Sequence, residues 1–175
     1  MKRSSFIFIT IFFTAFCVLQ SCGGNADNLS LGSAAPGFTL QDSDGNSFSL
    51  SEYKGKNPVV IYFYPKAGTP GCTKQACGIR DSFNKFNENN IIVFGISVDT
   101  KESIKDFINE NKLNFPLLSD ESKEISKAYG VLNSIGLDSR ITFVVDKQGN
   151  IADILRDVDV VTHADDVFSI AVKLK

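Results

Sequence analysis

Runs of mostly apolar residues mark the expected strands of the chain. Three of them, 59–64, 91–98 and 141–145, have the pattern of strands buried on both faces of a sheet. A shorter strand is expected at 151–155, directly after the turn Lys147-Gln148-Gly149-Asn150. The segments before and after Asp42-Ser43-Asp44-Gly45-Asn46 alternate in polarity, which predicts an N-terminal β-hairpin.

Apolar residues at helical spacing lie between the expected strands. The four sets are Ile79, Phe83 and Phe86; Ile104, Phe107 and Ile108; Ile125, Ala128 and Tyr129; and Val167, Ile170, Ala171 and Leu174. The last helix is expected to begin with the capping pattern Thr162-x-x-Asp165. Because strands and helices alternate, we expect an α/β domain with a central mixed β-sheet flanked by helices. The pattern alone leaves open whether the strand order is thioredoxin-like or flavodoxin-like.

Composition and charge are those of one folded domain. The chain has 175 residues, of which 43% are hydrophobic, so it can bury a core. Its formal net charge is −2. A nucleic-acid-binding protein would carry a basic excess, so no nucleic-acid partner is expected.

The first 21 residues differ from the rest of the chain. Lys2 and Arg3 precede the uncharged apolar run 6–19, which is shorter than the roughly 20 residues of a membrane-spanning helix and is typical of a secretory signal. The run ends in Leu19-Gln20-Ser21-Cys22, which resembles a bacterial lipoprotein cleavage box. That resemblance implies a signal peptide at 1–21 and a lipid on Cys22, followed by a flexible tether at 22–32. An ordinary secretion signal or an uncleaved anchor is the alternative.

Removal of this leader would make the chain more acidic. Lys2 and Arg3 would be lost together with no acidic residue, so the net charge would fall from −2 to −4. Without a polybasic segment, the lipid on Cys22 must provide the attachment to the membrane. The expected location is therefore the bacterial cell envelope, as a membrane-anchored lipoprotein on the periplasmic side.

Four cysteines are present, and two of them fall in the leader or at its end. Cys17 would be removed and Cys22 lipidated, which leaves Cys72 and Cys77. In an exported protein such a pair is ordinarily a structural disulfide. No metal or other cofactor is expected, because two thiols and the distant His163, the only histidine, do not make a zinc site.

The segment 65–77 combines the features of a reactive site. Its sequence is Pro65-Lys66-Ala67-Gly68-Thr69-Pro70-Gly71-Cys72-Thr73-Lys74-Gln75-Ala76-Cys77, directly after a buried strand and before a helix. Cys72 is therefore expected in the first turn of that helix, where free N–H groups and the helix dipole favour a thiolate. Since the thiolate is the nucleophilic form, Cys72 is the candidate nucleophile.

These residues resemble the peroxiredoxin signature, Pro65-x-x-x-Thr69-x-x-Cys72. The longer strings Tyr62-Phe63-Tyr64-Pro65-Lys66, Thr69-Pro70-Gly71-Cys72-Thr73 and Ala76-Cys77 are similar to the peroxiredoxin Q branch, also called bacterioferritin comigratory proteins. The similarity continues at 95–99, 117–120, 128–131 and 140–143. It implies a thioredoxin-like fold with an N-terminal β-hairpin for a domain at 33–175.

The resemblance also implies a function, a thioredoxin-dependent peroxidase acting on hydrogen peroxide and organic hydroperoxides. Cys72 would be the peroxidatic residue that becomes a sulfenic acid, and Cys77 the resolving residue that forms an intramolecular disulfide with it. A thioredoxin-like donor would then reduce the disulfide, and the protein is expected to be a monomer. Thr69 would bridge sulfur and peroxide, Arg140 would supply positive charge, and Pro65 would shield the sulfenic acid.

Simpler interpretations exist for the accompanying residues. Thr69 could be an ordinary helix cap. Arg140 could be a solvated surface charge, and Pro65 could merely end a strand. His163 is expected to be a helix-start residue with no catalytic part.

The spacing of Cys72 and Cys77 predicts a conformational change. Residues five apart in an α-helix have Cα atoms roughly 8.6 Å apart, whereas a disulfide tolerates at most about 7 Å. The reduced protein should therefore have a continuous helix from about residue 72 to 87, and the first turns must open before a disulfide forms. A structural disulfide here would disrupt its own helix.

Two competing functions belong to other classes of protein. An exported thiol–disulfide oxidoreductase would share the fold, but its working motif is Cys-x-x-Cys, whereas four residues separate Cys72 from Cys77. A lipoprotein that only binds would have no use for Cys72, Thr69 and Arg140 together. Peroxide consumption and insulin-disulfide reduction distinguish these possibilities.

Overall fold

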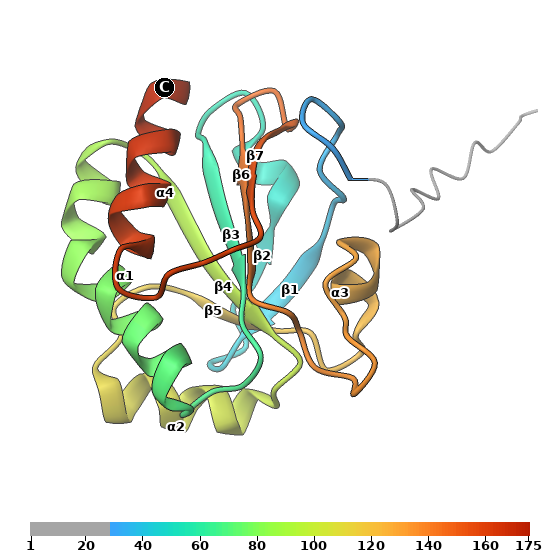
Figure 1. Ribbon diagram of the computed structural model, residues 1–175, viewed down its shortest axis with the longest axis vertical. Helices are drawn as coiled ribbons and strands as arrows, with labels where there is room; N and C mark the ends of the chain where they lie inside the picture. The colour runs from blue at the N-terminus through green and yellow to red at the C-terminus, as the bar shows by residue number, and fades with distance from the viewer. Residues whose placement is uncertain (1–28) are drawn as a thin grey trace, which may run out of the picture.

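The computed structural model describes residues 29–175 as one seven-stranded sheet between helices (Figure 1). The expected signal peptide, Cys22 and most of the tether lie outside the described residues. The strands are β1 (Thr39–Asp42), β2 (Ser47–Ser49), β3 (Val59–Phe63), β4 (Ile92–Ser97), β5 (Leu117–Ser119), β6 (Ile141–Val145) and β7 (Ile151–Leu155). The α-helices are α1 (Pro70–Glu88), α2 (Lys101–Asn111), α3 (Glu124–Ala128) and α4 (His163–Ala171), with 3-10 turns η2 (Leu50–Tyr53) and η3 (Val172–Leu174).

The sheet is mixed, as the alternation of elements predicted. Its strand order is β2-β1-β5-β4-β3-β6-β7. β4 is parallel to both β3 and β5, whereas β6 runs antiparallel to β3 and to β7. A flavodoxin-like sheet is mostly parallel, so the antiparallel β6 decides for the thioredoxin-like order. The predicted fold class is therefore confirmed.

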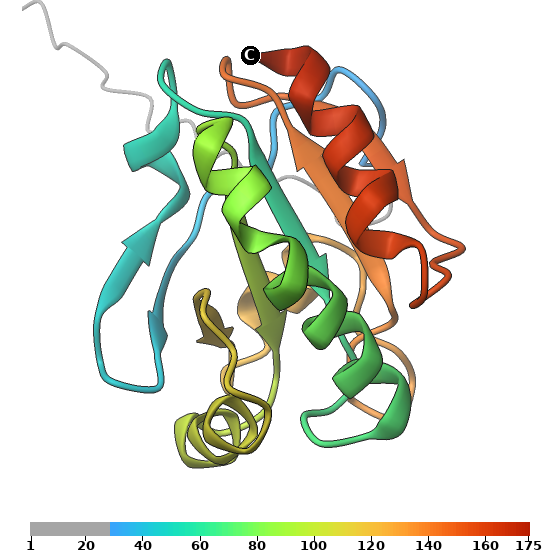
Figure 2. The same cartoon turned by 90° about the vertical axis from the view of Figure 1, so that its left-hand side faces the viewer.

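Two hydrophobic layers cover the two faces of the sheet. Along β3, Val60 and Tyr62 contribute to the layer shared with α1, α2 and α4, while Val59, Ile61 and Phe63 contribute to the opposite layer. Figure 1 shows α1 and α4 on one side of the sheet and α3 on the other. Figure 2 shows α1 and α4 side by side over the sheet. A strand buried on both faces explains why 59–64 has no polar position.

A close approach in the centre of the sheet requires glycine. Gly95 of β4 lies opposite Tyr62 of β3. A Cβ atom at Gly95 would come within 2.6 Å of the Tyr62 ring and 2.5 Å of Leu117. Tyr62 and Leu117 therefore fill the space that a side chain at position 95 would occupy.

Two local expectations need correction. β5 was not expected, because a three-residue strand is too short to show a period of two. The capping pattern at α4 is wrong, because Thr162 makes no side-chain cap and its hydroxyl instead donates to Asp166 Oδ2 at 2.7 Å. Asp165 is free to pair with Lys85 of α1. Within residues 29–175, no helix has the length and apolar character needed to cross a membrane.

Candidate active site

The topology brings Cys72 and Arg140 to the same edge of the sheet. Phe63, the last residue of β3, pairs with Ile141, the first residue of β6. The chain therefore leaves β3 where it enters β6. Residues 64–69 lead from this edge into α1, and Arg140 lies immediately before β6. The antiparallel pairing of β3 with β6 therefore brings Arg140 close to Cys72, although 68 residues separate them in the sequence.

Cys72 lies in the first turn of α1 and is only 2% exposed. The first hydrogen bond of the helix runs from Thr73 N to Thr69 O at 2.8 Å. The N–H groups of Gly71 and Cys72 precede that bond, so they have no carbonyl partner within the helix. The positive end of the helix dipole is therefore directed at the sulfur region, as the sequence predicted.

Arg140 approaches the sulfur from the other side. Its Nη2 donates to Cys72 Sγ at 3.4 Å. Gly71 makes room for this contact, because a Cβ atom there would lie 3.2 Å from the same Nη2. A permanent cation and a helix N-terminus together stabilise a thiolate. The interpretation of Arg140 as a solvated surface charge is therefore wrong.

Thr69 and Pro65 border the loop that leads to Cys72. Thr69 occupies the N-cap position of α1, yet its side chain caps no helical N–H. Its hydroxyl donates instead to the Lys66 carbonyl at 3.0 Å, which leaves the oxygen lone pairs free to accept. Among the described residues no hydrogen bond joins Thr69 to Cys72. Pro65 is half-buried at the bend that follows β3, so it ends the strand whatever else it does.

Asp99, which follows β4, holds the loop between β3 and α1 in place. Asp99 Oδ2 accepts hydrogen bonds from Ala67 N at 2.7 Å and from Ser97 Oγ at 3.0 Å. Gly68 has a φ of +76°, a left-handed conformation that favours glycine. The Ala67-Gly68 pair is therefore a turn whose position is set by its contact with the half-buried Asp99 carboxylate.

Gln75, which the sequence did not single out, supports Arg140. Gln75 is fully buried and its Oε1 accepts a hydrogen bond from Arg140 Nη1. Its Nε2 lies 3.2 Å from His163 Nδ1, and His163 Nε2 lies 2.8 Å from Thr142 Oγ1. Gln75 shares the buried face of α1 with Cys72 and Ile79, at i+3 from Cys72. A polar residue on an otherwise apolar helical face is the sequence signal that could have revealed it.

His163 begins α4, as expected, but it is only 1% exposed and touches the network behind Arg140. Burial lowers the pKa of His163 to about 4, so the imidazole is neutral at pH 7. The Tyr62 ring packs edge-on against it, with ring centroids 5.7 Å apart. The expected position of His163 at a helix start is therefore confirmed, whereas its contact with the network behind Arg140 was not expected.

Cys77 lies one and a half turns further along α1. It is half-buried, and both Cys72 and Cys77 are free thiols. α1 is continuous across them from Pro70 to Glu88, which agrees with the helix expected for the reduced protein. The next residue, Gly78, faces α4, since a Cβ atom there would lie 3.8 Å from Ala164 Cβ.

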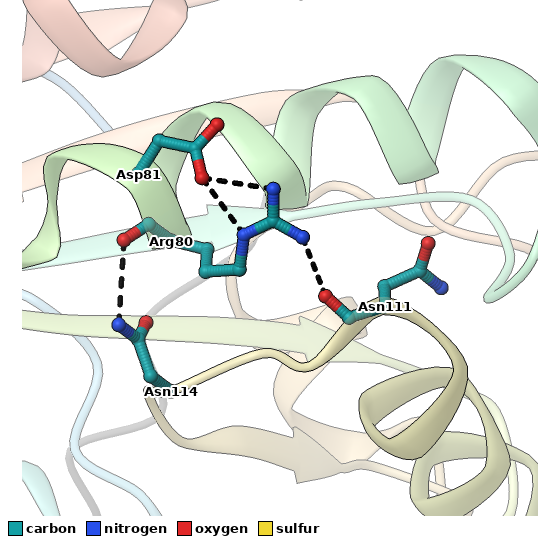
Figure 3. Close-up of polar contacts among 4 residues, drawn as sticks. All are labelled: Arg80, Asp81, Asn111 and Asn114. Atoms are coloured by element: carbon teal, nitrogen blue, oxygen red, sulfur yellow. Dashed lines mark hydrogen bonds and ion pairs between the residues drawn. The ribbon is translucent and has the colours of Figure 1, made fainter.

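The middle of α1 is attached to the end of α2 and to the segment that follows it (Figure 3). Arg80 Nη1 donates to the Asn111 carbonyl at 2.6 Å, and Asn114 Nδ2 donates to the Arg80 carbonyl at 3.4 Å. Arg80 also pairs with Asp81 at 2.8 Å. These contacts lie three residues beyond Cys77, so they separate the cysteine-bearing start of the helix from its anchored remainder. We call them the Arg80 anchor.

Comparison with known proteins places these features in a family. The sequence pattern of the AhpC/TSA family matches residues 31–154. A chloroplastic peroxiredoxin Q of Oryza sativa subsp. japonica is 52% identical over 123 residues, which are 69% of this chain and 56% of that protein. The chain thus spans just over half the length of this relative. In the described residues, no group of three or more His, Cys, Asp or Glu side chains is placed to hold a metal ion.

Solved structures agree with the sequence comparison. The crystal structure of peroxidoxin BcpB from Mycobacterium tuberculosis superimposes with a TM-score of 0.78 at 32% identity, covering 85% of this chain and 99% of that one. A Xanthomonas campestris bacterioferritin comigratory protein, described for its alkyl peroxide reduction activity, has a TM-score of 0.73 at 30% identity, covering 83% and 96%.

Proposed function

This chain belongs to the AhpC/TSA family, and from that premise we propose that it is a peroxiredoxin of the Q type that reduces peroxides with Cys72. The observation that carries the proposal is the contact between Arg140 Nη2 and Cys72 Sγ, 3.4 Å long, at the start of α1. A cation held against a buried sulfur at a helix N-terminus is an arrangement for a reactive thiolate. Simple packing of a cysteine would need neither group.

In the first step the Cys72 thiolate attacks one oxygen of the peroxide. A sulfur–oxygen bond forms, the O–O bond breaks, and Cys72 becomes a sulfenic acid. The second oxygen leaves with the electron pair as hydroxide or alkoxide and takes a proton to become water or an alcohol. Sulfur is oxidised by two electrons and the peroxide is reduced by two.

The surrounding groups act on the charge that moves during this step. Arg140 and the N–H groups of Gly71 and Cys72 are preorganised donors near the reacting sulfur, where negative charge passes to the leaving oxygen. We assign Thr69 to the peroxide through the lone pairs that its bond to Lys66 leaves free. Pro65, at the bend beside the loop, would limit access of water to the sulfenic acid.

In the second step Cys77 resolves the sulfenic acid. Its thiol attacks the Cys72 sulfur, a disulfide forms, and the sulfenic oxygen leaves as water. Because both cysteines lie on one continuous helix, the start of α1 must open first. A thioredoxin-like dithiol donor then exchanges with the disulfide, which returns both thiols and leaves the donor oxidised.

The substrate range is proposed to include hydrogen peroxide and organic hydroperoxides. The alkyl peroxide reduction described for the Xanthomonas campestris relative supports the organic class. We further propose that the protein acts as a monomer in the bacterial cell envelope, anchored through a lipid on Cys22 after removal of residues 1–21. Cys22→Ser is expected to abolish incorporation of labelled fatty acid, and persistent labelling would place the lipid elsewhere.

Stopped-flow kinetics of the reduced protein test the central proposal. Wild type should consume hydrogen peroxide with a burst of one equivalent, and mass spectrometry should then find a Cys72–Cys77 disulfide. Cys72→Ser should lose the burst while circular dichroism shows an unchanged fold. If Cys72→Ser retains most of the burst, the proposal is wrong. Insulin reduction without peroxide consumption would instead indicate a thiol–disulfide oxidoreductase.

A further inference from the structure

A continuous row of polar contacts runs from Cys72 into the core. It passes from Arg140 to Gln75 and His163 and ends at Thr142 of β6. Gln75 and Thr142 are fully buried, and His163 is 1% exposed. The row joins α1, α4 and β6 directly behind the proposed nucleophile. Buried polar groups persist when their hydrogen bonds are satisfied, so the row is a built feature of the site.

The direction of every hydrogen bond in the row follows from Arg140. A guanidinium only donates, so Gln75 must present its Oε1 to Arg140. The amide Nε2 of Gln75 then donates toward the His163 ring, where it lies 3.2 Å from Nδ1 and 3.5 Å from Nε2. Because Nε2 has a closer partner in Thr142 Oγ1, at 2.8 Å, we assign Nδ1 as the acceptor. A neutral imidazole with an accepting Nδ1 carries its proton on Nε2. That proton is donated to Thr142 Oγ1 at 2.8 Å.

A different protonation of the imidazole would disrupt this order. A proton on Nδ1 would face the amide N–H of Gln75, and two donors cannot form a hydrogen bond with each other. Rotation of the Gln75 amide would relieve that conflict, but it would turn the NH₂ group toward the Arg140 guanidinium. The charged groups near the imidazole are Arg140 itself and Asp166 of α4. Burial is the largest cause and Arg140 acts in the same direction, so together they outweigh Asp166 and lower the pKa of His163 to about 4.

We propose that His163, neutral and protonated on Nε2, is a positioning residue that fixes the amide of Gln75 and thereby holds Arg140 against Cys72. The inference rests on the proposed peroxidase function. His163 touches neither substrate nor sulfur, so it acts only through Gln75 and Arg140. Its effect is preorganisation, since a donor displaced by about 1 Å can cost a reaction up to roughly a hundredfold in rate.

Nitrogen NMR tests the tautomer directly. His163 is the only histidine in the chain, so a protein labelled with ¹⁵N-histidine gives one pair of ring signals that need no assignment. At pH 7 we expect the Nε2–H tautomer in wild type. In Gln75→Glu a carboxylate oxygen would face Nδ1, and we expect the Nδ1–H tautomer or the imidazolium. An Nδ1–H tautomer in wild type would overturn the proposal.

Peroxide kinetics test the effect on the site. His163→Leu removes the acceptor, and we expect the second-order rate of Cys72 oxidation to fall by about ten- to a hundredfold, with Cys72 alkylation requiring higher pH. His163→Asn places an amide oxygen near the position of Nδ1 and should recover most of the rate. Val167→Ala is the matched control, because it shortens a fully buried side chain of α4 outside the row.

The outcomes separate this inference from the proposed function. A wild-type protein that consumes no peroxide refutes the function, whatever the tautomer. A wild type that consumes peroxide while His163→Leu reacts equally fast overturns the positioning role. Val167→Ala slowing the reaction as much as His163→Leu would also overturn it, because loss of packing would then explain both. If His163→Leu does not fold, the tautomer in Gln75→Glu decides.

Discussion

Arg140 is the side chain on which the proposed chemistry depends most. Its Nη2 donates a hydrogen bond to the Cys72 sulfur. Arg140→Met should slow the peroxide step by roughly 10²–10³-fold, the usual effect of removing one preorganised donor. Alkylation of Cys72 should also require higher pH, since the thiolate loses its cation. Iodoacetamide labelling against pH and stopped-flow oxidation measure both effects.

Arg140→Lys is the control for this variant. It keeps the charge but loses the forked donor that reaches Gln75 and Cys72 together. Its rate should therefore lie between those of Arg140→Met and wild type. Arg140→Met with a wild-type rate and labelling profile would remove Arg140 from the mechanism.

Gly71 offers a gentler test of the same contact. A Cβ atom there would lie 3.2 Å from Arg140 Nη2, closer than ordinary side-chain contacts. Gly71→Ala should push the guanidinium away by a few tenths of an ångström and slow peroxide reduction by several-fold, with little change in the free energy of unfolding. Gly37→Ala is a matched control, since no atom lies within 4 Å of its added Cβ. Equal rates for both variants would mean that the contact is not needed.

The sequence located the centre of this site but not its support. The spacing of Pro65, Thr69 and Cys72 has a recognisable pattern because those residues are close in the chain. Gln75 and His163 meet only because α1 and α4 pack side by side, and 88 residues separate them. No periodicity records which polar residues of two distant helices will face each other. In the sequence, a histidine that is buried at a helix start therefore cannot be distinguished from an exposed one.

Helix α1 must be both ordered and able to open if Cys77 resolves Cys72. The Arg80 anchor, three residues beyond Cys77, holds the helix to the end of α2 and the segment that follows it (Figure 3). We therefore expect opening to be confined to about residues 70–79. Amide exchange should show lower protection there in oxidised than in reduced protein, with equal protection beyond the anchor. Equal protection at 72–78 in both states would mean that Cys77 is not the partner.

Gly78 makes this opening easier than alanine would. Glycine within a helix costs about 0.5–1 kcal/mol relative to alanine, and an added Cβ would meet Ala164 at an ordinary distance of 3.8 Å. Gly78→Ala should thus stabilise the helix and slow disulfide formation by about two- to fivefold, without changing the first oxidation step. Rapid-quench alkylation separates the two steps. A slower first step would show that the substitution disturbs Cys72 itself.

The fold as a whole was predictable because its sheet is buried on both faces. β3, β4 and β6 are long apolar runs, and the hairpin and helices have clear periods. Strand β5 was not predictable, because three residues are too few to show an alternation of polar and apolar positions. Its position in the sheet comes from its pairing with β1 and β4. The order of strands was fixed by the antiparallel pairing of β6 with β3, which is a contact between distant segments. Local pattern carries no information on that choice.

Two buried titratable groups should give the folded protein opposing responses to pH. Both oxygens of the Asp138 carboxyl are buried and lack a hydrogen-bond partner among the described residues. Burial raises the pKa of Asp138 to about 7; the neighbouring Ser126 hydroxyl and Lys123 oppose the rise, and Asp120 and Asp99 add to it. Burial lowers the pKa of His163 to about 4. Over much of the range between pH 4 and 7, Asp138 is therefore protonated and His163 is neutral in the folded protein.

The signs of the two effects follow from proton binding. Between pH 4 and 7 the folded state holds a proton on Asp138 that the unfolded state has lost, so the free energy of unfolding falls as pH rises. Between pH 4 and 6.5 the unfolded state holds a proton on His163 that the folded state lacks, so the free energy of unfolding rises with pH. Each is worth about 1.4 kcal/mol per pH unit at most, and the two largely cancel from pH 4 to 6.5.

Asp138→Asn should reveal the pH dependence that His163 gives to the free energy of unfolding, because the opposing contribution of Asp138 is removed. Relative to wild type, the free energy of unfolding of this variant should rise between pH 4 and 6.5 by up to about 3 kcal/mol. Urea unfolding at pH 4, 5, 6 and 7 measures the difference, and the carboxyl groups remote from Asp138 contribute equally to both proteins. His163→Asn should do the reverse, with its free energy of unfolding falling relative to wild type as pH rises. Parallel pH profiles for Asp138→Asn and wild type would show that the Asp138 carboxyl is ionised in the folded protein throughout this range.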